Sequence, residues 1–579
     1  MSRRRSPRAL AGALALAATL AVLPAAPAAA GATTQTFTFY GAGWGHGVGM
    51  SQWGAYGLAL QGWSYQRILG FYYRGTQLST VSTPQAIRVG LLQSRWQTSI
   101  QATNGPVDLR VGDPVTGTVI GTIPAGQTWV VALRSNDGRL WVRQQDGTWL
   151  GGQGYGGTSQ SLFAVYQPTS TVVYLPATGH RYNAGVLEFD VYQPCPTCGY
   201  RQRAIAVVDT DQYVWGIAEV PASWPMAALE AQAVAARTYA VEHATVLGQH
   251  RSGCNCAVLS STSDQVYSGY DEIAGYDGSR WLAAANATAG QIVTYQGQPA
   301  ETFYSSSSGG YTESPVQAWG GTNLPYLREG CDPGDYTAAN PNATWEYSFS
   351  AAALESKLTS WFGTDVGPVT GIAVTSRSGA ARALSVTVTG SGGAITTTGA
   401  SLAGALGLPS PLFYVNVDLL VTGAIRTLYD RLMCAPGLAA TPAVTAPGGL
   451  QQGFANGTIY APSSGGAFWL RGPILAKYQS LGGPGGLLGM PASGVTWRRT
   501  FTKAAFANGA IYWSAATTGA FEIHGPVMVQ YYALRGALGP LGLPVGDVQT
   551  LPSGQLSDSF QHGSITCPAS GGACSVATG

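Results

Sequence analysis

The hydrophobic and polar positions of the chain alternate in a strand-like way between residues 84 and 210. Short apolar segments are separated there by turn residues, which predicts a scaffold of β-strands. Its clearest strands are IRVGLL, TVIGTI, TWVVAL and AIAVVD. Hairpin-type turns are expected at Asn104-Gly105, Asp137-Gly138 and Asp146-Gly147. Because this segment shows no motif with recognisable chemistry, we interpret it as structural.

A helical periodicity appears next, in the segment EVPASWPMAALEAQAVAARTYA at residues 219–240. Apolar residues recur there at i, i+4, i+7 and i+11 and form one buried face: Leu229, Ala233, Ala236 and Ala240. We expect Ser223 or Trp224 to cap this helix, with Pro225 in its first turn. Because alanine is small, another stretch of backbone can pack closely against that face.

The other segments mix short helices with strands, which predicts an α+β fold: a β-rich main region with a few packed helices. Further strands are expected at 36–40, 291–295, 300–305, 371–376 and 383–389, with hairpins about Gly297 and Ser378-Gly379. Further helices are expected at 51–62, 65–73, 281–290 and 351–362, and a strand followed by a short helix at 395–408.

Beyond residue 448 the chain repeats itself. Phe454-Ala-Asn-Gly457 recurs as Phe506-Ala-Asn-Gly509, a shift of 52, and Phe560-Gln-His-Gly563 begins a third, truncated copy. A catalytic array could repeat in this way. The copies share turns and aromatic residues rather than acids, however, which favours a small attachment domain at the C-terminus.

We therefore expect four parts: a signal peptide at 1–30, a main domain at 31–425, a linker at 426–448 and a repeat region at 449–579. The first part has the charged end, apolar stretch and small-x-small pattern of a secretory signal: Arg3, Arg4, Arg5 and Arg8, then Ala9 to Leu23, then Ala28 and Ala30. An uncleaved membrane anchor is the alternative. The signal predicts a secreted protein.

Charge and composition exclude some classes of function. Only 10% of the residues are charged, yet after the N-terminus no apolar run reaches the about 18 residues of a membrane span. Removing the four signal arginines changes the formal net charge from +2 to −2, so there is no electrostatic case for nucleic acid. The abundance of glycine, tryptophan and tyrosine (79, 16 and 29 residues) is typical of exported, β-rich proteins with aromatic carbohydrate-type surfaces.

The eight cysteines of an exported chain favour disulfides. Cys567 and Cys574 are expected to pair, and Cys331 with Cys434 is a candidate for a further bridge. Two close pairs, Cys195 with Cys198 and Cys254 with Cys256, also resemble a zinc site, with His250 nearby. Since an oxidising compartment disfavours free thiolates, disulfides are favoured there, and zinc stays the alternative.

Glu219 is the strongest candidate for chemistry. Its neighbours Val220, Pro221 and Trp224 are apolar, which disfavours the charged carboxylate and suits a general acid. The alternative is a carboxylate at a helix start, stabilised by the helix dipole. Further along the helix, Arg237 could reach back to a substrate.

Three other segments carry candidate binding residues. His46 lies in a glycine-rich loop that lets backbone approach a ligand closely, and Ser51 and Gln52 follow it as a polar rim for a sugar. A loop and strand downstream carry Asp264, Gln265 and Tyr267. A serine-rich loop at 305–312 contains Ser307 and Ser308 and could line a groove. The alternatives are a structural histidine and a flexible serine linker.

Three long motifs together resemble the SpoIID/LytB (stage II sporulation protein D) family over roughly residues 36–425. They are GHGVGMSQ at 45–52, the Glu219 stretch with AQAVAARTYA, and SDQVYSGY followed by SSSSGGYTES. The tail is similar to LGFP repeats of wall-associated proteins. In the family, the GHGVGMSQ segment follows the last strand–helix unit of the domain, whereas here it comes first. This arrangement looks like a circular permutation, and it predicts that residues 36–76 pack beside 385–420 and next to Glu219.

The resemblance implies a peptidoglycan lytic transglycosylase that cleaves glycan strands to 1,6-anhydro-muramyl ends, with Glu219 as its one general acid and base. The expected substrate-binding residues are His46, Ser51, Gln52, Arg237, Asp264, Gln265, Tyr267, Ser307 and Ser308. No metal or cofactor is required, although a zinc site near His250 and Cys254 can occur in the family. The repeats would bind a cell-wall polymer, which places the protein at the wall.

Two other functions stay open from the sequence. LytB members were described as amidase enhancers, so a non-catalytic wall-binding protein with an amidase partner is one alternative. Ordinary glycoside hydrolysis uses two carboxylates and would need a partner for Glu219 such as Asp264 or Asp211.

Overall fold

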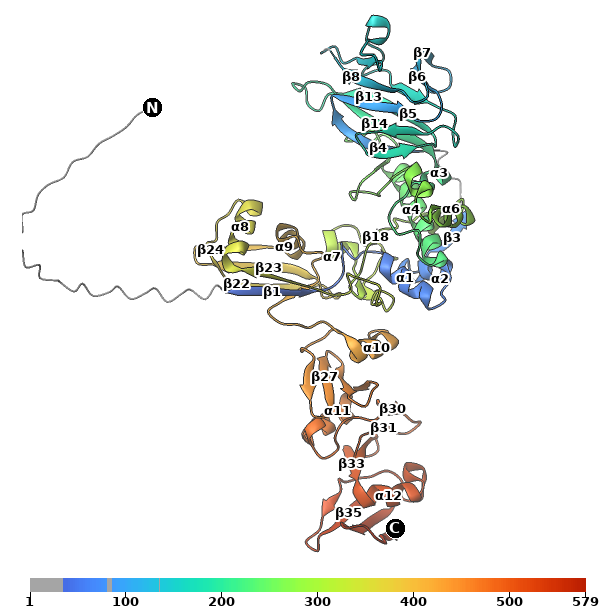
Figure 1. Cartoon of the computed structure of the whole chain (residues 1–579). Coiled ribbons are helices and arrows are strands. Elements are labelled where there is room, and N and C mark those ends of the chain that lie inside the picture. Colours follow the sequence, from blue (N-terminus) through green and yellow to red (C-terminus); the bar gives the residue numbers. More distant parts are fainter. Residues whose placement is uncertain (1–34, 81–85, 135) are drawn as a thin grey trace, which may run out of the picture.

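The computed structural model of the protein describes residues 35–80, 86–134 and 136–579 (Figure 1). The expected signal peptide at 1–30 lies outside these residues. The mixture of helices and strands confirms the expected α+β fold. Among the described residues, no helix is both long and apolar enough to cross a membrane.

The β-rich segment forms two antiparallel-rich sheets at the top of Figure 1, and one core lies between them. The seven-stranded sheet has the order β15 (Val258–Leu259), β4 (Ala86–Arg95), β14 (Arg201–Asp209), β13 (Val186–Tyr192), β10 (Leu162–Val165), β6 (Val107–Val111) and β7 (Thr118–Ile123). The five-stranded sheet has the order β12 (His180–Tyr182), β11 (Val173–Leu175), β5 (Gln97–Ala102), β8 (Thr128–Leu133) and β9 (Leu140–Arg143). All four clearest predicted strands are confirmed.

One predicted turn in this segment is wrong. Asn104-Gly105 joins β5 to β6, which belong to different sheets, so it links the sheets and does not close a hairpin. The Asn104 side chain is used to hold another loop, because it accepts the N–H of Val172 at 2.7 Å and donates to the Ser170 carbonyl at 3.0 Å. Asp137-Gly138 does lie between the paired strands β8 and β9.

Helix α4 (Met226–Val246) is the centre of the helical region beneath the sheets. Its predicted apolar face is confirmed, since Leu229, Ala233, Ala236 and Ala240 are fully buried. Around it pack α1 (Gln52–Leu60), α2 (Tyr65–Tyr72), α3 (Thr210–Trp215), α6 (Gly278–Ala287) and β16 (Gln291–Tyr295). The predicted cap is wrong, because neither Ser223 nor Trp224 caps the helix. Pro225 is the N-cap, without a side-chain hydrogen bond, and the helix begins at Met226.

The N-terminal segment packs where the resemblance predicted. Strand β1 (Thr36–Gly41) pairs with β21 (Trp345–Ser350) and with β25 (Phe413–Val415). The Gly45 N–H bonds to the Pro409 carbonyl at 3.0 Å. Beside them lie the sheet β22 (Val369–Arg377), β23 (Ala383–Gly390) and β24 (Gly393–Thr398) and helices α8 (Ala351–Phe362) and α9 (Gly399–Leu406). Such proximity is what a circular permutation requires; the permutation itself stays a prediction.

The hairpin expected at 291–305 is only partly formed. Strand β16 pairs with β17 (Gln298–Pro299), but β18 (Tyr304–Ser305) leaves it and pairs in parallel with β2 (Met50–Ser51). This pairing joins the serine-rich loop to the glycine-rich loop that carries His46. It therefore builds one wall of the site described below.

The repeats form three antiparallel four-stranded sheets, one after another along the lower part of Figure 1. Their strands are β26 (Val444–Ala446), β27 (Gly449–Phe454), β28 (Gly457–Pro462) and β29 (Phe468–Leu470); β30 (Thr496–Trp497), β31 (Thr502–Ala505), β32 (Gly509–Trp513) and β33 (Ala520–His524); and β34 (Gln549–Thr550), β35 (Gln555–Phe560), β36 (Gly563–Pro568) and β37 (Ser575–Thr578). Helices α11 (Gly472–Ser480) and α12 (Gly525–Ala533) join consecutive sheets.

The expected linker at 426–448 is folded. Helix α10 (Gly423–Arg431) precedes the first sheet in the same way as α11 and α12 precede the second and the third. Each of these helices carries a tyrosine that stacks on the phenylalanine of the next copy and donates to a glycine carbonyl. Tyr429 stacks on Phe454 at 5.2 Å between ring centroids and bonds to the Gly437 carbonyl at 2.9 Å. Tyr478 with Phe506 and Tyr531 with Phe560 repeat the arrangement. The repeats are thus attached through α10 to the main domain.

All eight cysteines are paired in disulfides: Cys195 with Cys198, Cys254 with Cys256, Cys331 with Cys434, and Cys567 with Cys574. The expected pairing of Cys567 and the candidate pairing of Cys331 are both confirmed. The Cys331–Cys434 bridge anchors the end of α10 to the main domain.

Candidate active site

The candidate site is a groove of about 480 Å³ between the glycine-rich loop, the start of the 219–240 segment and the segment 303–306. Its lining residues are Trp44, Gly45, His46, Gln52, Ala218, Glu219, Tyr239, Thr262, Ser263, Asp264, Val266, Phe303, Tyr304, Ser305, Ser306 and Trp319. Trp44 and Trp319 are about half exposed, at 53% and 51%, and offer flat aromatic faces to a ligand. Four of the residues predicted from the sequence meet here: Glu219, His46, Gln52 and Asp264.

The backbone around Glu219 is held by a short ladder to the 266–267 segment. The Ala218 N–H bonds to the Val266 carbonyl at 3.0 Å, and the Val266 N–H returns a bond of 2.6 Å to Glu219 Oε1. Glu219 precedes α4 and is not in the first turn of that helix, which has no acidic residue. The alternative of a carboxylate stabilised by the dipole of α4 therefore does not apply.

Burial raises the pKa of Glu219 above its ordinary value. Val220 and Trp224 beside it are buried, and Trp224 packs against Trp53 with 4.7 Å between ring centroids. Three hydrogen bonds oppose the shift, from the Val266 N–H, the Gln52 side chain and the Tyr304 hydroxyl. Gln52 Nε2 is 3.4 Å from Glu219 Oε2. The raised pKa favours the protonated form of the carboxyl group, and the hydrogen bonds fix its position.

Tyr304 is a site residue that the sequence reasoning missed. Gln265 Nε2 donates to the Tyr304 hydroxyl at 2.7 Å, which leaves the hydroxyl hydrogen free to be donated to Glu219. Gln265 is itself oriented, because its Oε1 accepts from the Tyr213 hydroxyl at 2.7 Å. The parallel pairing of β18 with β2 places Tyr304 here. The local sequence pattern around residue 304 does not predict that pairing.

We expect Tyr304→Phe to raise the pKa of Glu219 further, because the substitution removes a donor that stabilises the carboxylate. The carboxyl ¹³C shift of Glu219, followed by NMR through a pH titration, measures this directly. Tyr295→Phe, in β16 and away from the groove, is the matched control and should leave the titration unchanged. An unchanged or lowered pKa in Tyr304→Phe would contradict the proposed contact.

His46 is a neutral part of the groove wall. Its Nδ1 accepts the Val48 N–H at 2.9 Å, so the proton of the neutral ring is on Nε2. Burial, together with the charge of Arg382, lowers the pKa of His46 to about 4. The ring packs against Trp319 with 5.0 Å between centroids.

Asp264 lines the groove, but its carboxylate is already engaged. Arg251 Nη2 lies 2.6 Å from its Oδ2, which also accepts the Leu259 N–H at 2.7 Å. The Tyr239 hydroxyl donates to Oδ1 at 3.3 Å. Asp211 does not line the groove, because it lies on α3 and pairs with Arg237. Neither acid named for a two-carboxylate mechanism is therefore free.

Ser51, Ser307 and Ser308 do not line the groove; they are buried in a polar cluster behind it. Ser51 and Ser307 donate through Oγ to Asp335 at 2.5 and 2.8 Å, and Ser308 donates to Asp332 at 2.8 Å. We correct their predicted role from substrate binding to support of the loops. In the same loop, their neighbours Ser305 and Ser306 do reach the groove.

Gln265 and Tyr267 are also behind the groove rather than in it. Gln265 is fully buried in the chain of contacts that leads to Tyr304. Tyr267 belongs to the main core, where its ring stacks with those of Tyr213 and Tyr182. Neither side chain has a surface that a ligand can touch, so both predictions of direct binding are corrected.

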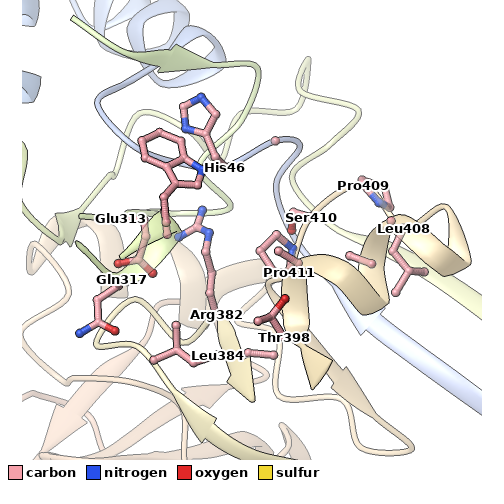
Figure 2. A pocket seen from close by; sticks show the side chains of 17 residues that line it. His46, Glu313, Gln317, Arg382, Leu384, Thr398, Leu408, Pro409, Ser410 and Pro411 are labelled. Carbon is pink, nitrogen blue, oxygen red and sulfur yellow. The ribbon is translucent and has the colours of Figure 1, made fainter. Parts of the chain in front are cut away.

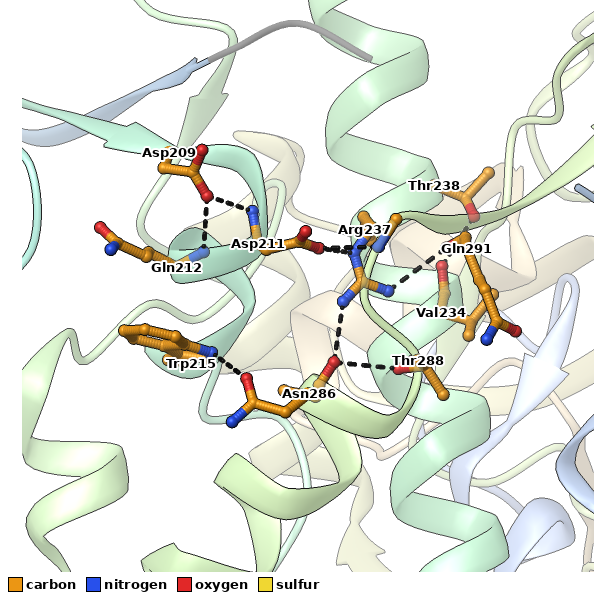
Figure 3. A network of polar contacts seen from close by, with 12 residues as sticks. Asp209, Asp211, Gln212, Trp215, Val234, Arg237, Thr238, Asn286, Thr288 and Gln291 are labelled. Carbon is orange, nitrogen blue, oxygen red and sulfur yellow. Dashed lines mark hydrogen bonds and ion pairs between the residues drawn. The ribbon is translucent and has the colours of Figure 1, made fainter. Parts of the chain in front are cut away.

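Arg237 is fully buried and does not line the groove. It lies in a network of polar contacts with α3 (Figure 3). Its Nε is 2.8 Å from Asp211 Oδ1, and its Nη atoms donate to the carbonyls of Gln291 and Ala285 at 3.2 and 3.1 Å. It therefore joins α4 to α3, to the end of α6 and to the start of β16. Because Glu219 follows α3 closely, Arg237 supports the site without contacting it.

We expect Arg237→Leu to lower the free energy of unfolding by about 3 kcal/mol, because two carbonyls and Asp211 lose the hydrogen bonds that Arg237 donates. Urea unfolding followed by circular dichroism measures the change. Arg499→Leu, on the exposed surface, is the matched control and should change stability by less than about 0.5 kcal/mol. Equal effects of the two substitutions would contradict the structural role.

The four cysteines of the suggested zinc site do not fit a metal, because both pairs are closed as disulfides. His250 Nδ1 bonds to Asn255 at 2.6 Å. Within the described residues, no group of three or more His, Cys, Asp or Glu side chains is placed to hold a metal ion.

Glu219 also opens on a second hollow of about 500 Å³, formed with the loop after it and with α5 (Tyr270–Ala274). Glu272 lines this second hollow, and burial raises the pKa of Glu272 to about 7. No sequence pattern pointed to Glu272, because α5 is short and carries no motif. Glu219 thus lies where the groove and the second hollow meet.

Comparison with known proteins identifies two kinds of domain. The family model "Stage II sporulation protein" (SpoIID) matches residues 199–295, which include Glu219 and α4. The LGFP repeat model matches residues 437–486 and 488–539. The two matches agree with the helical region and with the first two repeats of the fold.

Curated relatives cover part of the chain. The chain is similar to the amidase enhancer of Bacillus subtilis (strain 168), with 34% identity over 24% of this chain and 17% of the relative. It is similar to stage II sporulation protein D of the same organism, with 30% identity over 27% of this chain and 47% of the relative. It is also similar to stage II sporulation protein D of Bacillus amyloliquefaciens, with 30% identity over 26% of this chain and 46% of the relative. The chain spans less than half the length of these relatives. It therefore contains a domain of the SpoIID family followed by LGFP repeats.

Proposed function

We propose that this protein is a peptidoglycan lytic transglycosylase that cleaves glycan strands to 1,6-anhydro-muramyl ends. The observation that carries the proposal is the state of Glu219. It is a fixed carboxyl group whose pKa is raised by burial, and it lies at the junction of the groove and the second hollow. A glycan strand bound through both would place a glycosidic bond at this carboxyl group.

The reaction needs one residue that first gives and then takes a proton. Protonated Glu219 donates its proton to the glycosidic oxygen as the C1–O bond breaks. The resulting carboxylate then removes the proton from the C6 hydroxyl of the same muramyl residue, and O6 bonds to C1. Glu219 ends protonated, no water is consumed, and the product carries a 1,6-anhydro ring. The donors on Glu219 stabilise the intermediate carboxylate.

The relatives and the repeats support a substrate in the cell wall. The SpoIID-family domain and the LGFP repeats are consistent with a wall-associated protein, and we infer secretion from the sequence of the first 30 residues. In this proposal the repeats bind a wall polymer, and their attachment through α10 keeps the groove at a fixed distance from it.

Digestion of purified glycan strands in H₂¹⁸O tests the reaction type. Intramolecular capture by O6 leaves no ¹⁸O at the new C1, whereas hydrolysis inserts one atom from water. Mass spectra free of the label support transglycosylation. Incorporation of ¹⁸O at the new ends would favour hydrolysis, with Glu272 as the carboxyl group to examine as second catalyst.

A non-catalytic amidase enhancer is the second candidate, because one relative is named for that activity. This function predicts that the protein stimulates a separate wall amidase and that Glu219→Gln stimulates it equally. A lack of stimulation, together with cleavage of glycan by the isolated protein, would exclude it.

A further inference from the structure

A third hollow, here called the side pocket, adjoins the groove, and Figure 2 shows the side chains that line it. Gly45, His46 and Trp319 line both spaces, so the side pocket borders directly on the groove. Its volume is about 330 Å³, at the low end of the roughly 300–1,000 Å³ typical of small-molecule sites. That size fits one small chemical group rather than a polymer.

The floor of the side pocket holds a buried arginine with an unused donor. Arg382 is 2% exposed, and its two Nη atoms donate to the carbonyls of Tyr311 and Ser308 at 3.0 and 2.6 Å. Within the part of the chain that the structure describes, its Nε–H has no partner. Burying such a donor costs about 1–3 kcal/mol unless something binds to it. A ligand with an acceptor atom would supply the missing bond.

The charges around Arg382 favour a neutral ligand. Glu313 lines the pocket next to Arg382 and is 1% exposed (Figure 2). Arg382 and Glu313 are the Arg and Glu of the pocket lining, so one guanidinium lies beside one carboxylate there. The side pocket offers no excess charge to attract an anion or an amine.

The rest of the wall is small and apolar, formed by Ala383, Leu384, Ala403 and Leu408. A secondary amide with a short alkyl group matches this combination. Its carbonyl can accept from Arg382 Nε–H, its N–H can donate to the Glu313 carboxylate, and its alkyl group can lie against the alanines and leucines.

We propose that the side pocket binds a neutral secondary amide carried by the glycan in the groove. This inference rests on the proposed function. Two parts of peptidoglycan carry the required group: the 2-acetamido group of a sugar and the first peptide bond of a stem peptide. Binding in the side pocket would make cleavage of the glycosidic bond depend on an amide substituent carried by a neighbouring part of the glycan.

Isothermal titration with the Glu219→Gln protein tests the proposal without turnover. The probes are a hexamer of N-acetylglucosamine, its de-N-acetylated counterpart, and glycan strands with and without stem peptides. Ala400→Trp fills the side pocket from an exposed position at the start of α9. Ala352→Trp, at the equivalent exposed position of α8, is the control. Urea unfolding verifies that both variants are folded.

We expect Ala400→Trp to weaken binding by about tenfold or more, and Ala352→Trp to leave it unchanged. If the acetamido group is the occupant, the loss appears with the N-acetylated hexamer and is absent with the de-N-acetylated one. If the peptide bond is the occupant, the loss appears only with peptide-bearing strands. Equal affinities of both variants for all four probes, or no measurable binding of any, would overturn the proposal. The ¹⁸O experiment on the unsubstituted protein tests the proposed function independently.

Discussion

Substitution of Glu219 by glutamine should reduce the rate of glycan cleavage by at least about 10²-fold, and by as much as about 10⁴-fold. Glutamine cannot donate the proton that the leaving oxygen needs, nor take one from the C6 hydroxyl. Its side-chain oxygen can still accept the Val266 N–H, so the loop should keep its position. Initial rates on purified glycan strands measure the loss, and urea unfolding should show unchanged stability.

Two other carboxyl groups give matched controls for this substitution. Glu230→Gln changes a partly exposed carboxyl group on α4 outside the groove, and we expect it to leave the rate unchanged. Glu272→Gln changes the carboxyl group of the second hollow, and the one-residue mechanism predicts a change of only a few-fold. A loss in Glu272→Gln as large as that in Glu219→Gln would contradict the mechanism and favour two carboxylates.

The second large effect is expected on stability, from Asp335→Ala. Asp335 is 1% exposed and accepts four hydrogen bonds, from the hydroxyls of Ser51 and Ser307 and from the N–H groups of Ser308 and Gly309. Its removal leaves these buried donors without a partner, and we expect the free energy of unfolding to fall by about 4 kcal/mol. Urea unfolding measures the change.

Asp335→Ala should also disturb the groove. Asp335 joins the helix cap at Ser51 to the serine-rich loop, and these two segments carry Gln52 and Ser305 into the groove. Asp365→Ala is the control, because Asp365 is exposed and accepts the Gly367 N–H within its own loop. We expect it to change stability by less than about 1 kcal/mol. Similar effects of both alanine substitutions would contradict the role given to Asp335.

Local patterns predicted the parts of the fold that depend on local rules. Alternation identified β4, β7, β8 and β14, and the 3.6-residue period identified the buried face of α4. The 52-residue shift identified the repeats. The linker was mispredicted because composition describes flexibility, whereas α10 is held by a long-range disulfide and by the stacking of Tyr429 on Phe454.

The same difference between local patterns and long-range contacts explains which residues of the candidate site could be predicted. The motifs led to Glu219, His46, Gln52 and Asp264, which do line one groove. Ser307 and Ser308 were taken for binding residues because small polar side chains suit both a groove and a buried cluster. Ser307 and Ser308 belong to the buried cluster because they donate to Asp335 and Asp332, two acids that lie outside every motif. Tyr304 was missed because a parallel pairing between β2 and β18, about 250 residues apart in the sequence, sets its position.

Mass spectrometry of the ends made from peptide-free glycan strands, by the unsubstituted protein and by Glu219→Gln, tests the central claim most directly. Muramyl ends with a 1,6-anhydro ring are lighter than reducing ends by the mass of one water molecule. We expect anhydro ends from the unsubstituted protein and their near absence from the Glu219→Gln digest. Reducing ends from the unsubstituted protein, or anhydro ends formed at an equal rate by Glu219→Gln, would contradict the claim.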